Sequence, residues 1–276
     1  MSDRVLINGQ PADHIPVSDR GLQYGDGLFE TLAVIDSRPR LWERHMARLS
    51  RGEGVLGLPI SDKRQLRQEA DRLCTGCERG VLKLIITRGS GGRGYRPPEQ
   101  AAPRRILSLH DWPDYPQSWY RQGMRLRLCE TRWGHNPQLA GIKHLNRLEQ
   151  VMARQEWRDP GIAEGIMLDL EDRVISATQG NLFLVDDNGL HTPDLSRAGI
   201  SGVIRDLVIE SAGDLDMTVG IDEITLERVQ QADALFVTNS ILGLCPVAAL
   251  EGWAYAPERV PESLRQTLEE RMRELP

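Results

Sequence analysis

A short segment with two prolines separates this chain into two parts. Residues 111–117 read Asp-Trp-Pro-Asp-Tyr-Pro-Gln, and the prolines disfavour a regular helix or strand because each lacks a backbone N–H donor. The 276 residues suffice for one large domain or for two modest domains with a core each. We therefore predict a small N-terminal domain over residues 1–110, a linker over 111–120 and a larger C-terminal domain over 121–276.

Strand and helix patterns are mixed in both parts. Apolar and β-branched runs predict strands, and apolar residues at helical spacing predict helices. In the first part the expected strands are 5–7, 81–87 and 105–110, and the expected helices are 41–49 and 63–73. In the second part the expected strands are 124–129, 165–170, 174–176, 181–185 and 234–237, and the expected helices are 144–157, 200–212 and 261–275. This mixture predicts an α+β protein.

The composition is that of an ordinary globular protein, with 40% hydrophobic and 27% charged residues. No apolar run approaches the roughly 18 residues that a membrane span needs, and the first residues lack the regions of a signal peptide. The net charge of -6 argues against general affinity for nucleic acid. We expect a cytoplasmic protein that binds neither membranes nor nucleic acid.

A glycine-rich segment, Gly-Ser-Gly-Gly-Arg-Gly at residues 89–94, fits the pattern of a dinucleotide site. That site needs a helix that begins inside the segment, so that the helix N-terminus meets the pyrophosphate. Here Pro97 and Pro98 follow and block such a helix. The sequence instead favours a flexible loop that presents Arg93 and Tyr95, or a plain surface turn.

Metal and nucleophile motifs are weak in this chain. Cys74 and Cys77 form a single C-x-x-C pair, whereas a zinc site needs two further ligands. Cys129 and Cys245 are isolated, so free thiols are expected. The histidines show no metal-ligand spacing, and there is no G-x-S-x-G or P-loop motif. We expect no metal.

Lys143 follows the uncharged stretch from Leu139 to Ile142, just ahead of an expected helix. A lysine in isolation at such a position is usually a solvated surface charge. Apolar surroundings, however, lower the pKa of a lysine and favour a neutral, nucleophilic amine. Lys143 is therefore a candidate nucleophile.

Four segments resemble the class IV aminotransferase family, the fold-type IV enzymes of pyridoxal 5′-phosphate (PLP). They are residues 17–30, 88–95, 136–150 and 181–183, and they span most of the chain. The strings Arg-Gly-Ser-Gly-Gly-Arg-Gly-Tyr and Gly-Ile-Lys-His-Leu-Asn-Arg-Leu-Glu-Gln are similar to those of the aminodeoxychorismate lyases in this family. The resemblance implies PLP as the cofactor and a homodimer. It also implies a two-domain α+β fold, with a small α/β sandwich-like domain and a larger pseudo-barrel domain.

The resemblance implies roles for particular residues. Lys143 would carry PLP as a Schiff base and act as the catalytic base. Arg48 would bind the cofactor phosphate, a role that a guanidinium fork suits. The backbone N–H groups at a helix start would bind the same phosphate, and a loop would close its site; the residues implied here are Val203, Ile204, Asn239 and Ser240.

Ser176 departs from the pattern of the family, which has a glutamate at this position to pair with the pyridinium nitrogen. A hydroxyl cannot hold that nitrogen protonated as a carboxylate does, so the cofactor would be a weaker electron sink. Glu171 and Asp172 are near in sequence, but the strand pattern does not place them at the same point.

The function implied by the resemblance is conversion of 4-amino-4-deoxychorismate to 4-aminobenzoate and pyruvate, a step of folate biosynthesis. Candidates to bind the two substrate carboxylates are Tyr24, Arg93 and Tyr95. Arg38 and Arg40 are weaker candidates, since most arginines are surface residues. The alternatives are a D-amino-acid or branched-chain aminotransferase, against which Ser176 argues, and a PLP-binding relative or folate-pathway partner without activity.

Overall fold

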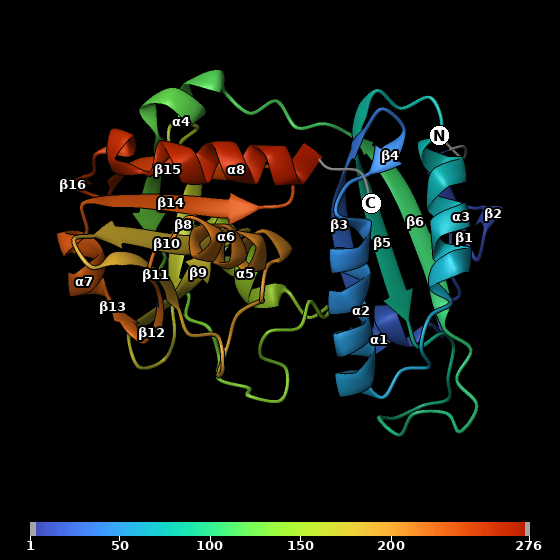
Figure 1. The fold of residues 1–276 in the computed structure, drawn as a ribbon. Helices are drawn as coiled ribbons and strands as arrows, with labels where there is room; N and C mark the ends of the chain where they lie inside the picture. The colour runs from blue at the N-terminus through green and yellow to red at the C-terminus, as the bar shows by residue number, and fades with distance from the viewer. Residues whose placement is uncertain (1–3, 274–276) are drawn as a thin grey trace. The chain divides into compact units, whose positions relative to one another are not determined.

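The computed structural model describes residues 4–273, which pack as two compact units (Figure 1). The first unit comprises residues 4–113 and 142–146, and the second comprises residues 114–141 and 147–273. Residues 1–3 and 274–276 of the predicted domains lie outside the described residues, and so do the last two residues of the helix predicted over 261–275. The first unit ends within the segment predicted as a linker, and it also takes in the segment around Lys143.

The first unit is a six-stranded antiparallel sheet with two long helices on one face (Figure 1). The strand order is β2-β1-β6-β5-β3-β4. The strands are β1 (Val5–Ile7), β2 (Gln10–Pro11), β3 (Gly27–Ile35), β4 (Arg38–Pro39), β5 (Arg79–Thr87) and β6 (Arg104–Asp111). The helices are α1 (Arg20–Tyr24), α2 (Trp42–Leu56) and α3 (Lys63–Cys74).

Local sequence signals define the long helices. In α3, Leu66, Ala70 and Leu73 are buried along one side, and the Asp62 side chain accepts hydrogen bonds from two N–H groups of the first turn. Helix α2 runs beyond its predicted end and stops at Gly57, whose φ of +59° is favourable for glycine. Both helices therefore lie where the apolar spacing predicts them.

Side chains of the sheet alternate between its two faces. On β3, Leu28, Glu30 and Leu32 are buried on the face that α2 covers, whereas Phe29 and Thr31 are half-buried on the opposite face. The strand partners on β5 and β6 continue this opposite face. We call it the second face, and it consists of Phe29, Thr31, Lys83, Ile85, Ile106 and Ser108.

The segment 142–146 adds an extended stretch to this sheet beside the start of β3. The Phe29 N–H donates to the Lys143 carbonyl over 3.0 Å, and the Leu145 N–H donates to the Gly27 carbonyl over 3.0 Å. Leu28 and His144 form an antiparallel bridge between these two bonds. The helix predicted from His144 therefore begins only at Leu148, because pairing with a distant strand holds the intervening residues extended.

The second unit is built on a ten-stranded mixed sheet. Its strands are β7 (Met124–Leu128), β8 (Glu164–Leu168), β9 (Arg173–Ala177), β10 (Asn181–Asp186), β11 (Gly189–Pro193), β12 (Val219–Asp222), β13 (Ile224–Thr225), β14 (Ala234–Asn239), β15 (Gly243–Leu250) and β16 (Trp253–Ala254). The helices are α4 (Gln117–Gln122), α5 (Leu148–Gln155), α6 (Val203–Asp214), α7 (Leu226–Gln231) and α8 (Glu262–Arg273), with a 3₁₀ turn, η2 (Pro257–Arg259).

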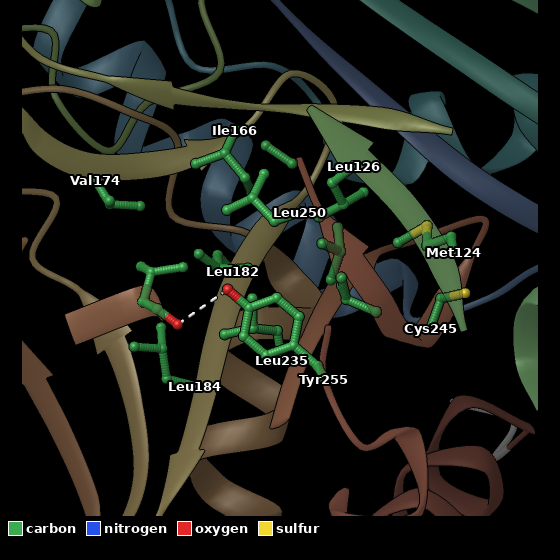
Figure 2. Packing of buried hydrophobic residues seen from close by; sticks show 14 of the residues in the cluster. Met124, Leu126, Ile166, Val174, Leu182, Leu184, Leu235, Cys245, Leu250 and Tyr255 are labelled. Carbon is green, nitrogen blue, oxygen red and sulfur yellow. Dashed lines mark hydrogen bonds between the residues drawn. The ribbon is translucent and has the colours of Figure 1, made fainter. Parts of the chain in front are cut away.

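This sheet curls around one apolar core, as the pseudo-barrel expectation requires. Strand β9 contacts β10 and β11 in addition to its ladder partners β8 and β13. The enclosed side chains come from most of the strands, and Figure 2 shows them pointing toward one another, among them Met124, Leu126, Ile166, Val174, Leu182, Leu184, Leu235 and Leu250. The Tyr255 hydroxyl, at the edge of this core, donates to the Val229 carbonyl over 3.1 Å. The fold is thus the expected α+β class.

The predicted linker is only partly irregular. Asp111 ends β6, and α4 begins at Gln117, directly after Pro116. A proline is well tolerated just before or at the start of a helix, where its missing N–H has no partner to lose. Among residues 4–273, no helix combines the length and the apolar character that crossing a membrane requires.

Candidate active site

Lys143 lies on the second face of the first unit's sheet. The backbone register places it opposite Phe29, so both side chains extend from the same face. The Lys143 amine is 4.3 Å from the centre of the Phe29 ring. An aromatic face at this distance attracts the charged amine and excludes water from one side of the neutral amine.

Arg48 belongs to a buried cluster with Glu30 and His45. Its Nε donates to Glu30 Oε1 over 2.8 Å and its Nη2 donates to Oε2 over 2.5 Å. His45 Nδ1 donates to the same Oε2 over 2.6 Å. All three side chains are at most 5% exposed. The two-point contact fixes the plane of the guanidinium on helix α2.

Charge within this cluster is set by its contacts. Burial alone would raise the pKa of Glu30, but the Arg48 charge and the hydrogen bonds from Arg48 and His45 lower this pKa to about 2. Burial holds the pKa of His45 below its usual value, and the positive charges of Arg48 and Lys143 act in the same direction. At neutral pH Glu30 is therefore a carboxylate and His45 a neutral donor.

Helix α6 in the second unit offers free backbone donors at its first turn. Its N-cap residue is Gly202, and no side chain caps the N–H groups that follow at Val203 and Ile204. A Cβ on Gly202 would lie 2.1 Å from Asn181 Oδ1, so any other residue there would require the Asn181 side chain to move. A helix N-terminus of this kind attracts anions such as phosphate.

The ends of β10 and β14 lie next to this turn. Asn181 pairs with Thr238 across the two strands, and its Nδ2 donates to the Ile200 carbonyl over 2.9 Å. The buried Thr238 hydroxyl has no hydrogen-bond partner among residues 4–273. Asn239 Oδ1 accepts from two N–H groups of the following turn, which includes the half-buried Ser240. The structure thus brings the predicted phosphate-binding residues of this unit together around Asn181.

Ser176 lies on β9 opposite Met167 of β8 and is 4% exposed. A register shift beside this pair places Ile175 and Ser176 on one face, where Met167 and Ile175 pack against Leu195 and Ala198. Leu195 and Ala198 belong to the loop that leads directly into Gly202. Ser176 therefore occupies the face of the sheet against which Leu195 and Ala198 pack.

Three carboxylates near Ser176 in sequence or on the neighbouring strand lie away from its position, namely Glu171, Asp172 and Glu164. Glu171 and Asp172 lie in the turn between β8 and β9 and pair with arginines on the surface. The buried Glu164 lies on β8 two residues before Ile166 and therefore on the same face as Ile166. This is the opposite face from Met167 and Ser176. This placement agrees with the prediction that Glu171 and Asp172 do not lie at the position of Ser176.

Tyr24 and Tyr95 are brought together at the glycine-rich loop of the first unit. Their rings meet edge to face with centroids 5.6 Å apart, and the Gly94 N–H donates to the Tyr24 hydroxyl over 3.2 Å. Tyr95 is 86% exposed and Arg93 is exposed. No helix begins in this loop, which removes the basis for a dinucleotide site.

Arg20 anchors the same loop and was not singled out by the sequence. Its guanidinium donates to the Gly94 and Tyr95 carbonyls over 3.0 Å each, and to Asp26 over 2.8 Å. Glu30 and His45 were missed as well. Arg20, Glu30 and His45 make contacts with residues that are distant in sequence, so no local pattern indicates them. Of the buried cluster, the sequence motif identified Arg48 alone.

Arg38 and Arg40 lie away from Lys143. Arg38 pairs with Ile35 at the far end of β3, six residues from Phe29. At about 3.3 Å per residue, this end of the strand is roughly 20 Å from the Lys143 side. The structure therefore does not bring these arginines to the amine.

Comparisons with known proteins found relatives that cover nearly the whole chain. The model of the family "Amino-transferase class IV" matches residues 27–250. An aminodeoxychorismate lyase of Vibrio harveyi is 36% identical over 252 residues, 91% of this chain and 92% of that protein. The crystal structure of 4-amino-4-deoxychorismate lyase from Pseudomonas aeruginosa has a TM-score of 0.91 and 47% identity over 96% of this chain and 97% of that chain. A putative branched-chain-amino-acid aminotransferase of Methanocaldococcus jannaschii is 26% identical over 99% of this chain and 96% of that protein.

Proposed function

The chain belongs to the class IV aminotransferase family, and from this premise we propose that it is a PLP-dependent lyase. Its reaction would convert 4-amino-4-deoxychorismate to 4-aminobenzoate and pyruvate. The observation that carries the proposal is Lys143, whose amine lies on the ring of Phe29 while its backbone is bonded into the sheet. Higher identity to the two lyases than to the branched-chain aminotransferase supports the lyase reaction.

The donor set fits a phosphorylated aldehyde. Lys143 supplies the amine that an aldehyde requires. Arg48 supplies a planar cation, and the uncapped start of α6 supplies N–H groups for a phosphate. The buried Thr238 hydroxyl, which has no partner among residues 4–273, is a further donor that a phosphate would satisfy. Val203, Ile204, Asn239 and Ser240 complete the proposed set.

When bound, PLP supplies an electron sink for the carbon that bears the substrate nitrogen. The Lys143 amine takes the proton from that carbon as general base. The bond between the adjacent carbon and the enolpyruvyl oxygen then breaks, and the leaving group gains a proton from Lys143 or water and departs as pyruvate. The six-membered ring becomes aromatic, which favours elimination.

Ser176 suits a lyase better than an aminotransferase. An aminotransferase must return a proton to the cofactor and cycle it through an amine form, and it gains more from a carboxylate at the ring nitrogen. Elimination is driven by the aromatic product and needs less from this position. Tyr24, Arg93 and Tyr95, which share the glycine-rich loop region, are the proposed contacts of the substrate carboxylates.

The same proposal includes a homodimer in the cytoplasm. Its test is an assay of the purified, PLP-loaded protein for 4-aminobenzoate and pyruvate. We expect both products in equal amounts, and we expect Lys143→Ala to abolish them together with the visible absorbance of the bound cofactor. Turnover retained in Lys143→Ala would end the assignment of the amine. Amino transfer from amino acids to 2-oxoglutarate without 4-aminobenzoate would favour the aminotransferase alternative.

A further inference from the structure

Lysine is rare in this chain. Of its 34 basic residues only three are lysines, at positions 63, 83 and 143. Arginine is thus its ordinary cation, and each lysine stands out. Lys63 is exposed at the start of α3, whereas the other two lysines meet at one aromatic ring.

That ring belongs to Phe29. The Lys143 amine is 4.3 Å and the Lys83 amine 5.7 Å from its centre. The two amines are therefore no farther apart than the sum of these distances. Lys83 lies on β5, paired with Thr31 on β3 and with Ser108 on β6, so its side chain belongs to the second face, as does that of Lys143.

The surroundings of Lys83 leave its charge without a counterion. Its neighbours on the second face are neutral, namely Thr31, Ile85 and Ser108. Among residues 4–273, no carboxylate lies within ion-pair distance of its amine. Arg104, at one end of the same face, is by contrast paired with Asp19. A half-buried cation whose strand neighbours on this face are neutral or aromatic is suited to bind an anionic ligand.

The ring carboxylate of the substrate lies at a distance that Lys83 can reach. Its amino group and ring carboxylate lie at opposite ends of a six-membered ring, about 6 Å apart for bonds of about 1.4–1.5 Å. A hydrogen bond of about 2.8 Å to the carboxylate places a cation about 9 Å from the substrate nitrogen. Because the nitrogen reacts where the Lys143 amine lies, Lys83 is within reach.

We propose that Lys83 binds a carboxylate of the substrate and so makes the site specific for a dicarboxylate. This inference rests on the proposed lyase function. It adds a cation on the sheet, whose backbone is hydrogen-bonded on both sides. The other proposed contacts are Tyr24 at the end of α1 and Arg93 and Tyr95 in the glycine-rich loop. A compact ammonium on a flexible stem needs less room beside the Phe29 ring than a guanidinium would.

The test compares PLP-loaded wild type with Lys83→Met and Lys83→Arg. We expect Lys83→Met to raise the KM for 4-amino-4-deoxychorismate about tenfold or more, the loss of one charge-assisted hydrogen bond, with a smaller change in kcat. Lys83→Arg, which keeps the charge, should recover part of this loss. Lys63→Met, at the exposed start of α3, is the matched control and should leave KM unchanged.

Binding of the products gives a readout without turnover. Dissociation constants of 4-aminobenzoate and of pyruvate are measured by titration of each PLP-loaded protein, and the constant that rises in Lys83→Met identifies the carboxylate. Unchanged constants for both products, with unchanged KM, would overturn the role of Lys83. Absence of 4-aminobenzoate formation in the wild type would instead overturn the proposed function, and the binding titrations would still decide whether Lys83 holds a carboxylate.

Discussion

Glu30 in the first unit and Glu164 in the second are both buried glutamates on strands paired on both sides, yet their pKa values are shifted in opposite directions. Glu30 is contacted by Arg48 and His45, and its pKa is about 2. Glu164 is contacted by the Thr178 hydroxyl and the Gln179 N–H, and burial raises its pKa to about 7. Two neutral donors do not offset desolvation, whereas a guanidinium does.

The difference gives each glutamate its own pH window. Glu30 has a lowered pKa, so its contribution to stability is present above the unfolded value of about 4.5 and is lost as the pH falls toward 2. Glu164 has a raised pKa, so the folded state binds its proton more tightly and stability is lost as the pH rises from about 4.5 to 7. Across each window the free energy of unfolding changes by about 3 kcal/mol.

The largest expected effect breaks the charged pair. Glu30→Gln removes the carboxylate that contacts the buried Arg48 guanidinium at two points, which costs about 3–5 kcal/mol of unfolding free energy at pH 7. Urea unfolding measures this loss, and PLP titration of the apoprotein should show weaker binding because Arg48 is no longer held in its plane. Glu43→Gln, on the exposed side of the helix α2 that carries Arg48, is the control. Equal stability of Glu30→Gln and wild type at pH 7 would contradict the role of this pair.

The next largest effect comes from removing the carboxyl group of Glu164, which titrates near neutral pH. Glu164→Gln keeps an oxygen that accepts from Thr178 but cannot ionise, so the variant should be close to wild type near pH 4.5 and more stable by up to about 3 kcal/mol at pH 8. Urea unfolding at a series of pH values measures this growing difference in stability. Glu258→Gln, at an exposed site, should show no such trend. A constant difference between pH 4.5 and 8 would refute the raised pKa.

The smallest effect adjusts the same carboxylate through its donor. Thr178→Val removes the hydroxyl that donates to Glu164 over 2.8 Å, at a cost of about 1 kcal/mol or more above pH 7 and less below pH 5, where the carboxyl is neutral. The pKa of Glu164 should rise further, which a pH series of unfolding free energies or carboxyl NMR shifts can follow. Thr178→Ser retains the hydroxyl and should behave as wild type; if it matches Thr178→Val instead, packing rather than the hydrogen bond is responsible.

Local patterns predicted most of the fold. The helix expected at 63–73 and the strand expected at 81–87 match α3 and β5 closely, because their apolar spacing reflects burial on one side of an element. Strand β3 was not predicted, although it carries Phe29 and Glu30. Glu30 and Thr31 interrupt its apolar run, and Glu30 is buried only because Arg48 and His45 reach it from another element.

The candidate site was predictable where family motifs name a residue and not where contacts create one. Lys143, Arg48 and Gly202 stand in recognisable strings. Arg20 and Lys83 depend on contacts with residues more than 50 positions away, and no local spacing indicates them. The count of lysines was an available signal for Lys83, since a chain so rich in arginine places few lysines by default.

The pairing register of the short extended stretch beside β3 determines which of its side chains reaches the site. Side chains of paired strands alternate, so a shift of residues 142–146 by one position along β3 would move Lys143 to the helix-covered face and bring Ile142 or His144 opposite Phe29. Neither an alkyl group nor an imidazole can do what a primary amine does there. Two backbone hydrogen bonds thus select which functional group meets the aromatic ring, before any side-chain interaction contributes.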